Sequence, residues 1–165
     1  MPIRKYVIKL TDDEWQKCVE CAKQRQHNLT QNQTSIDRAA VPNDPTKDLQ
    51  GVVTECAVSK YFGVPYRYQT VYEKNFCDIS IGVEVRSSLH ANGHLIVYTY
   101  DKVAPYVMTV PYLNEHKVVL IGWRDLVDCR LEKYWRTTPK VRKESWWISQ
   151  TDLHDMATLK QRLSV

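Results

Sequence analysis

The sequence predicts one α/β domain, with α+β as the alternative, in which a central mixed β-sheet is flanked by helices. Three observations predict it: a helical spacing of apolar residues before position 63, an alternating spacing from Phe76 onward, and a closing strand and helix. Helices that precede and follow a run of strands cover the faces of a sheet. The length suits a single domain over residues 1–165.

The first elements are a short strand or extended lead-in over 3–9 and a helix over 12–26. Thr11 and Glu14 form a capping box that starts this helix. Its apolar stripe includes both cysteines of the Cys18-x-x-Cys21 motif, so we expect them in the core rather than on a metal. Five cysteines and no secretory signal predict reduced thiols.

The segment 27–47 is polar and predicts a long loop of the kind that often contacts a substrate. A second helix over 47–62 has a clean apolar stripe. Gly63 and Pro65 end it.

The remaining chain is predicted to be mostly strands, separated by turn residues such as Gly82 and Asn92-Gly93. A short helix is expected over 123–129, and residues 130–143 read as basic and irregular. Thr151 is expected to cap a last helix over 151–163. The predicted strands are 76–81, 83–88, 94–100, 105–111, 117–122 and 145–149.

Charge and hydropathy limit the classes of function that the chain can have. The net charge is +4 and the pI about 8.7, which permits nucleic-acid binding without requiring it. No apolar run reaches the roughly 20 residues that span a bilayer. The N-terminus MPIRKYVIKL is not a signal peptide. We therefore expect a cytoplasmic protein without a membrane partner.

The segment Phe76–Ser88, FCDISIGVEVRSS, contains the residues with the clearest chemistry. Residues two apart in a strand share a face, so Glu84 and Arg86 point the same way. Asp78 on the preceding strand converges with Glu84 if the two strands pair across a turn near Gly82. Two converging carboxylates repel each other, and a divalent cation such as Mg²⁺ or Mn²⁺ resolves that repulsion. On the second helix, Glu55 lies at the flank of the apolar stripe and could orient a water as a third carboxylate.

These residues resemble the PD-(D/E)XK superfamily of restriction-endonuclease-like nucleases, most closely its small phage-encoded members. The resemblance covers roughly residues 48–123 and rests on Glu55, Phe62-Gly63, Asp78, Glu84-Val-Arg86 and Asp101. It implies a restriction-endonuclease-like core, Asp78 and Glu84 as metal ligands, Glu55 as the helix acid, and Arg86 at the position of the family's lysine. For a phage-encoded chain it also implies the host cytoplasm.

Arg86 departs from the family pattern, because an arginine stabilises negative charge but cannot act as a base. The proline of the family's name motif is replaced by Cys77. Lys60 and Lys102 could substitute for the lysine, and Lys102 is the better placed of the two. The alternative is a purely structural role for these residues, in which Asp78 caps a turn and Glu84 pairs with Arg86 on a solvated sheet.

A basic segment supports a nucleic-acid partner, although a solvated surface loop is the alternative. Its cations are interleaved with Tyr134 and Trp135, which can stack on unpaired bases. Trp146-Trp147, in contrast, is expected to pack in the core and at its edge. The predicted nucleic-acid-binding residues are Lys133, Arg136, Lys140, Arg142 and Lys143.

Three functions follow in order of preference. The first is a metal-dependent nuclease that hydrolyses phosphodiester bonds, in DNA before RNA, with Glu55, Asp78, Glu84 and Arg86 as catalytic residues. The second is a catalytically inactive nucleic-acid-binding protein on the same fold. The third is a phage structural or host-interaction protein. A homodimer stays open, because no heptad or apolar patch marks an interface.

Overall fold

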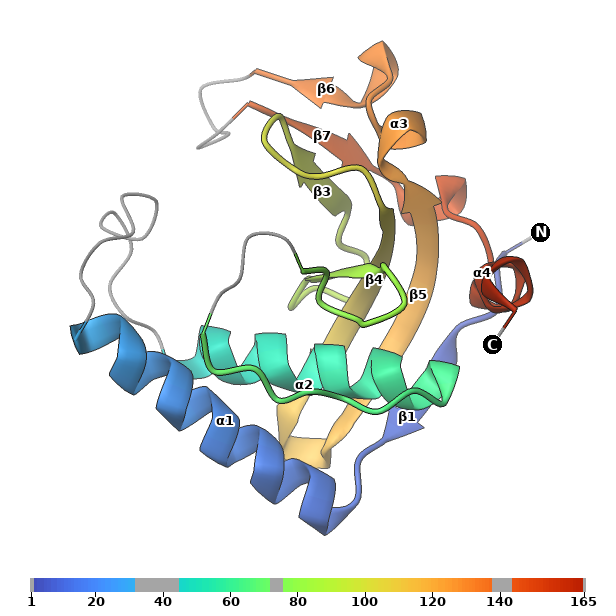
Figure 1. Cartoon of the computed structure of the whole chain (residues 1–165). Coiled ribbons are helices and arrows are strands. Elements are labelled where there is room, and N and C mark those ends of the chain that lie inside the picture. Colours follow the sequence, from blue (N-terminus) through green and yellow to red (C-terminus); the bar gives the residue numbers. More distant parts are fainter. Residues whose placement is uncertain (1, 32–44, 72–75, 138–143, 165) are drawn as a thin grey trace.

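The computed structural model describes residues 2–31, 45–71, 76–137 and 144–164. Its helices and strands form a mixed α/β architecture (Figure 1). The helices are α1 (Asp12–Gln31), α2 (Pro45–Phe62), α3 (Leu126–Cys129) and α4 (Met156–Leu163). The strands are β1 (Tyr6–Lys9), β2 (Glu84–Ser87), β3 (Leu95–Tyr98), β4 (Pro105–Tyr112), β5 (Lys117–Asp125), β6 (Trp135–Arg136) and β7 (Ser145–Ile148).

Two sheets lie on top of each other. The first is a mixed sheet in the order β1-β5-β4-β2, in which β2 runs parallel to β4 and the other pairs are antiparallel. The second is an antiparallel sheet in the order β3-β7-β6. The expected central mixed sheet is therefore present, and a second, smaller sheet accompanies it.

The alternation of side chains along β4 and β5 explains the layering. Val107 and Leu120 point into a core formed with α1 and α2, whereas Met108 and Ile121 point into a second core formed with β3 and β7. The mixed sheet thus has helices on one face and the three-stranded sheet on the other (Figure 1).

The capping box predicted for the first helix is confirmed. The Thr11 N–H donates to Glu14 Oε1 at 2.8 Å, and the Glu14 N–H donates to Thr11 Oγ1 at 3.1 Å. Helix α1 extends to Gln31, beyond the predicted end at residue 26. Cys18 and Cys21 are buried in the core between α1 and α2, as expected.

Helix α2 ends as its sequence predicts. Gly63 adopts a φ of +70°, and the Val64 N–H donates back to the Ser59 carbonyl at 3.1 Å. This left-handed residue after the last turn is a common helix terminus that glycine favours. Of the predicted loop over 27–47, the ends belong to α1 and α2, and residues 32–44 lie outside the described residues.

The predicted strand over 76–81 is wrong. Its residues form a turn in which Ile79 makes an isolated bridge with Val83. The Gly82 N–H donates to the Ile79 carbonyl at 3.0 Å, and Gly82 has a φ of +86°. Because the chain reverses within this turn, β2 does not pair with residues 76–81 but runs parallel to β4.

Three later strands are confirmed as β3, β4 and β5, although β5 continues through Asp125 and leaves only Leu126–Cys129 for the helix predicted over 123–129. In the basic segment, β6 adds a short strand, while residues 138–143 lie outside the described residues.

The strand predicted over 145–149 is confirmed as β7, but the last helix begins later than predicted. A bridge between Trp123 and His154 holds the chain extended after a short 3-10 turn. Asp155, rather than Thr151, caps α4 by accepting a hydrogen bond from the Ala157 N–H at 2.8 Å.

In the part of the chain that the structure describes, no helix combines the length and apolar character needed to cross a membrane.

Candidate functional site

Strand β2 presents Glu84 and Arg86 on one face of the mixed sheet. Glu84 is opposite Tyr106 in the register with β4, and Arg86 is opposite Met108, so both point toward the second sheet. Val85 points the other way, into the core with α2. Glu84 is only 4% exposed, which is rare for a carboxylate unless a charged partner accompanies it.

The turn before β2 brings Asp78 against Glu84. The Val85 N–H donates to Asp78 Oδ2 at 2.9 Å, which fixes the aspartate carboxyl beside the strand. Burial, together with a hydrogen bond to Glu84 and its charge, raises the pKa of Asp78 to about 7. The two carboxyl groups predicted to converge therefore lie together, although a turn rather than a strand carries the first of them.

Glu55 is the third acid in this neighbourhood. Burial and the nearby charge of Asp78 both raise its pKa. Two donors hold its Oε2 atom: the Arg25 guanidinium of α1 at 3.0 Å, and the Tyr66 hydroxyl at 2.5 Å. The helix acid is thus oriented by its partners and close enough to Asp78 to feel its charge.

Arg86 pairs with Asp101 rather than with Glu84. Its Nη2 lies 2.6 Å from Asp101 Oδ1, and its guanidinium lies 5.1 Å from the centre of the Tyr106 ring. The Tyr98 N–H donates to the other oxygen of Asp101 at 2.8 Å. Among the described residues the buried Nε of Arg86 finds no hydrogen-bond acceptor.

Lys102 is the cation that lies against the acid pair. Its Nζ is 2.7 Å from Glu84 Oε1 and also donates to the Phe76 carbonyl. The contact with Glu84 is an ion pair without hydrogen-bond alignment, because the buried Oε1 makes no such bond within the described residues. Lys102, rather than Arg86, is therefore the cation in contact with Glu84.

The residues present fit a divalent cation of the magnesium class. Asp78 and Glu84 offer only oxygen donors, and burial followed by the hydrogen bond and charge of Glu84 raises the pKa of Asp78. Within residues 2–31, 45–71, 76–137 and 144–164, no group of three or more His, Cys, Asp or Glu side chains is arranged to hold a metal. An ion there would rely on two carboxylates, with water and substrate oxygens completing its coordination.

The predicted nucleic-acid-binding cations are only partly described. Lys133 lies 4.9 Å from the centre of the Tyr134 ring, and Arg136 lies 4.8 Å from the centre of the Trp147 ring. Lys140, Arg142 and Lys143 lie outside the described residues. Lys133 and Arg136 thus each lie over an aromatic ring, Tyr134 just before β6 and Trp147 on β7.

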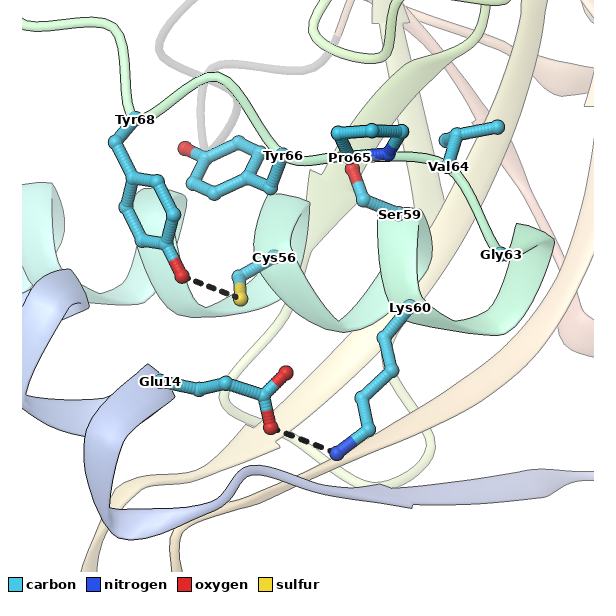
Figure 2. Close-up of a pocket in the computed structure, with 9 residues that line it drawn as sticks. All are labelled: Glu14, Cys56, Ser59, Lys60, Gly63, Val64, Pro65, Tyr66 and Tyr68. Carbon is cyan, nitrogen blue, oxygen red and sulfur yellow. Dashed lines mark hydrogen bonds and ion pairs between the residues drawn. The ribbon is translucent and has the colours of Figure 1, made fainter.

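A separate pocket of about 370 Å³ lies beside α2, and Tyr66 forms part of its lining (Figure 2). Its polar groups pair with each other: Glu14 with Lys60 at 2.7 Å, and Cys56 with the Tyr68 hydroxyl at 3.7 Å. Since these pairs already satisfy one another, we assign no ligand to the pocket. The pocket lies next to Tyr66, whose hydroxyl donates to Glu55.

Arg25 and Tyr66 are site residues that sequence reasoning missed. Arg25 is 30 positions before the glutamate it binds, and Tyr66 is 11 positions after it. Neither belongs to a motif, so only the packing of α1 and of the 63–68 segment against α2 brings them to the site.

Comparisons with protein-family models, with curated proteins and with solved structures find no match.

Proposed function

We propose that this chain is a metal-dependent nuclease that hydrolyses phosphodiester bonds, in DNA before RNA, on a restriction-endonuclease-like core. The observation that carries the proposal is the pair of neighbouring acids Asp78 and Glu84, of which Glu84 is buried and lies 2.7 Å from Lys102. Buried acids next to one another lower the stability of a fold. Such an arrangement is typical of sites where charge serves catalysis or metal binding.

The chain's own residues have distinct roles in this proposal. Asp78 and Glu84 would hold Mg²⁺ or Mn²⁺, which supplies Lewis-acid polarisation of the phosphodiester and activation of a water. Lys102 leaves Glu84 and contacts a phosphate oxygen, where its charge stabilises the transition state. Arg86, kept in place by Asp101, adds a second fixed positive charge beside the acid pair.

Glu55, which lies near Asp78, has a supporting role. Burial and the charge of Asp78 raise the pKa of Glu55, and a carboxyl with a raised pKa is a stronger base toward a water than an ordinary one. Arg25 and Tyr66 keep its Oε2 atom in a fixed position. A water held between Glu55 and Asp78 would then be oriented by two carboxyl groups.

A second function, a catalytically inactive nucleic-acid-binding protein, is favoured by one specific observation. Both predicted active-site charges on β2 are already neutralised inside the protein, Glu84 by Lys102 and Arg86 by Asp101. A site in which these two charges are paired within the protein can keep the fold and its binding surface without turnover.

Incubation of the purified protein with single-stranded and duplex DNA and RNA, with Mg²⁺ or Mn²⁺ and with EDTA, tests the proposal. We expect metal-dependent cleavage by the wild type and a loss of at least about 100-fold in Asp78→Asn and Glu84→Gln. Glu115→Gln is the matched control, because that acid is exposed and pairs with Lys117. Equal cleavage by all four proteins would reveal a contaminating nuclease.

Two other outcomes overturn the proposal. Salt-dependent binding without cleavage of any substrate leaves the inactive binding protein. Absence of both cleavage and salt-dependent binding leaves a structural or host-interaction protein, because a basic nucleic-acid surface releases counterions on binding.

A further inference from the structure

We propose that the outward face of the β3-β7-β6 sheet is a platform on which unpaired bases stack, so that the substrate of this site is a single-stranded nucleic acid. The inference rests on the proposed function for its link to cleavage, but the platform itself stands on independent contacts.

The register of the second sheet separates an apolar face from an outward face. Leu95, Val97 and Ile148 are fully buried against the mixed sheet. Ile96 pairs with Trp147 in the register, and both are half-buried on the opposite side. The outward face therefore displays a large aromatic ring in the middle strand of the sheet.

Positive charge accompanies this ring. The guanidinium of Arg136 on β6 lies over the Trp147 ring at 4.8 Å from its centre. The charge of Arg136 also contributes, after burial, to the lowered pKa of His94, whose ring lies 5.7 Å from that of Trp147. A ring next to a cation matches a nucleotide, which offers a flat base and an anionic phosphate.

A second aromatic group continues the same face toward the candidate active site. Tyr98 is opposite Ser145 in the register, and Ser145 is in turn opposite Arg136, so Tyr98 and Arg136 share a side of the sheet. The rings of Tyr98 and Tyr100 stack with centres 5.4 Å apart and planes 2° from parallel. Tyr100 remains 64% exposed.

The chain connects this tyrosine stack to the acid site. Asp101 and Lys102 follow Tyr100 in the chain, and they bind Arg86 and Glu84 respectively. The Tyr98 N–H also donates to Asp101. A nucleotide stacked at Tyr100 would thus lie next to the segment that carries Asp101 and Lys102.

The chemistry of the platform favours a single strand over a duplex. Aromatic rings gain energy by covering the flat face of a base, which is already covered in a double helix. Single-strand binding of this kind tolerates any base and depends on salt through the few cations involved. DNA and RNA share this chemistry, so both are tested.

Fluorescence anisotropy of labelled oligo-dT and oligo-U in EDTA tests the platform without any cleavage. We expect Tyr100→Ala and Trp147→Ala to weaken binding at least about fivefold each. Arg136→Ala should lower the slope of log affinity against log salt by about one, and the two ring substitutions should leave that slope unchanged. Comparison of the two oligonucleotides tells DNA from RNA.

The matched controls are Tyr112→Ala and Lys117→Ala. Lys117 lies over the Tyr112 ring at 5.1 Å from its centre, a similar pair at the far end of β4. These variants should bind as the wild type does. Tyr100→Ala keeps the test decisive if Trp147→Ala fails to fold, because Tyr100 is the exposed member of the platform.

Wild-type affinity in Tyr100→Ala overturns the platform, and so does equal competition by a duplex of the same length. The two proposals fail separately. Oligonucleotide binding that depends on the rings, without cleavage under any condition, removes the nuclease and keeps the platform. Metal-dependent cleavage with ring variants that bind normally keeps the nuclease and removes the platform.

Discussion

Charge at the level of single residues sets the character of the candidate site. Burial and the neighbouring carboxylate of Glu84 raise the pKa of Asp78, and burial and the charge of Asp78 raise the pKa of Glu55. The positive groups that offset them, Lys102 and Arg25, come from other segments of the chain. Glu84 and Glu55 thus each depend on a specific cation, and removal of that cation leaves a buried charge without its ion-pair partner.

The first residue-scale prediction concerns Lys102→Met. Glu84 is almost completely buried, so loss of the ammonium leaves an uncompensated carboxylate in the sheet. We expect the free energy of unfolding at pH 8 to fall by about 1–2 kcal/mol, less than for a fully buried pair because the lysine side chain is 36% exposed. Urea unfolding followed by circular dichroism measures it.

Lys117→Met is the control for this prediction. Lys117 forms an ion pair of similar length, 2.6 Å, with Glu115, which is 59% exposed. Such a surface pair contributes little, so this variant should lie within about 0.5 kcal/mol of the wild type. An equal loss in the two variants would show that the Glu84 pair has no special role.

At the scale of elements, two short connections build the site rather than the regular strands. The 79–83 turn carries the chain from Asp78 to Glu84 within a few residues. The connection after β3 carries Asp101, and Arg130 clamps it by donating to the carbonyls of Tyr98, Thr99 and Asp101 at 3.2, 3.0 and 3.1 Å. The positions of both acids therefore depend on backbone geometry in loops.

Gly82→Ala tests the turn. A Cβ at this position meets no atom within 4 Å, but the φ of +86° is unfavourable for any residue with a side chain. We expect a destabilisation of about 1–2 kcal/mol in urea unfolding. A larger loss of cleavage than of stability would show that the turn also aligns Asp78 with Glu84.

Gly51→Ala is the opposite case on α2. Its Cβ would lie 3.8 Å from Arg25, an ordinary contact, in a helical backbone. Alanine there should stabilise the protein by about 0.5–1 kcal/mol, because glycine is a poor helix former.

If Gly82→Ala were as stable as the wild type, the strain assigned to the turn would be absent.

The sequence predicted elements whose cues are local. The capping box and apolar stripe specified α1, and the glycine after Phe62 specified the end of α2. The alternating Phe76, Asp78 and Ser80 gave a false strand signal. The spacing of side chains does not reveal that the Val85 N–H donates to the Asp78 carboxylate, a contact that forms because Asp78 lies in a turn.

The candidate site was predictable only for its members on or near one strand. The pairing of Asp78 with Glu84 follows from the five positions between them and a glycine turn. The partners of the other charges come from segments distant in the chain: Lys102, in the connection after β3, reaches Glu84 on the edge strand β2. No local pattern determines such a contact. The parallel pairing of β2 with β4 depends on the path of the whole chain segment that connects the two strands.

At the scale of the whole molecule, the acid site makes stability depend on pH. The folded pKa of Asp78 is about 7, against an ordinary value of 3.8, so between these pH values the folded protein keeps a proton that the unfolded chain has lost. Stability contributed by this group is present at pH 4 and is lost as the pH rises to about 7. Asp78→Asn should remove the loss, because its amide oxygen still accepts from the Val85 N–H.

We therefore expect Asp78→Asn to be more stable than the wild type by about 1–3 kcal/mol at pH 8 and equal to it at pH 4, measured by urea unfolding across this range. Added Mg²⁺ should stabilise the wild type at pH 8, with little effect at pH 5, because binding requires the deprotonated carboxyl. In Asp78→Asn the metal effect should vanish at both pH values. Asp13→Asn, whose acid is 77% exposed and pairs with Lys17, should behave as the wild type throughout. A stability of Asp78→Asn below that of the wild type at pH 8 would mean that the aspartate holds the fold together rather than serving the metal.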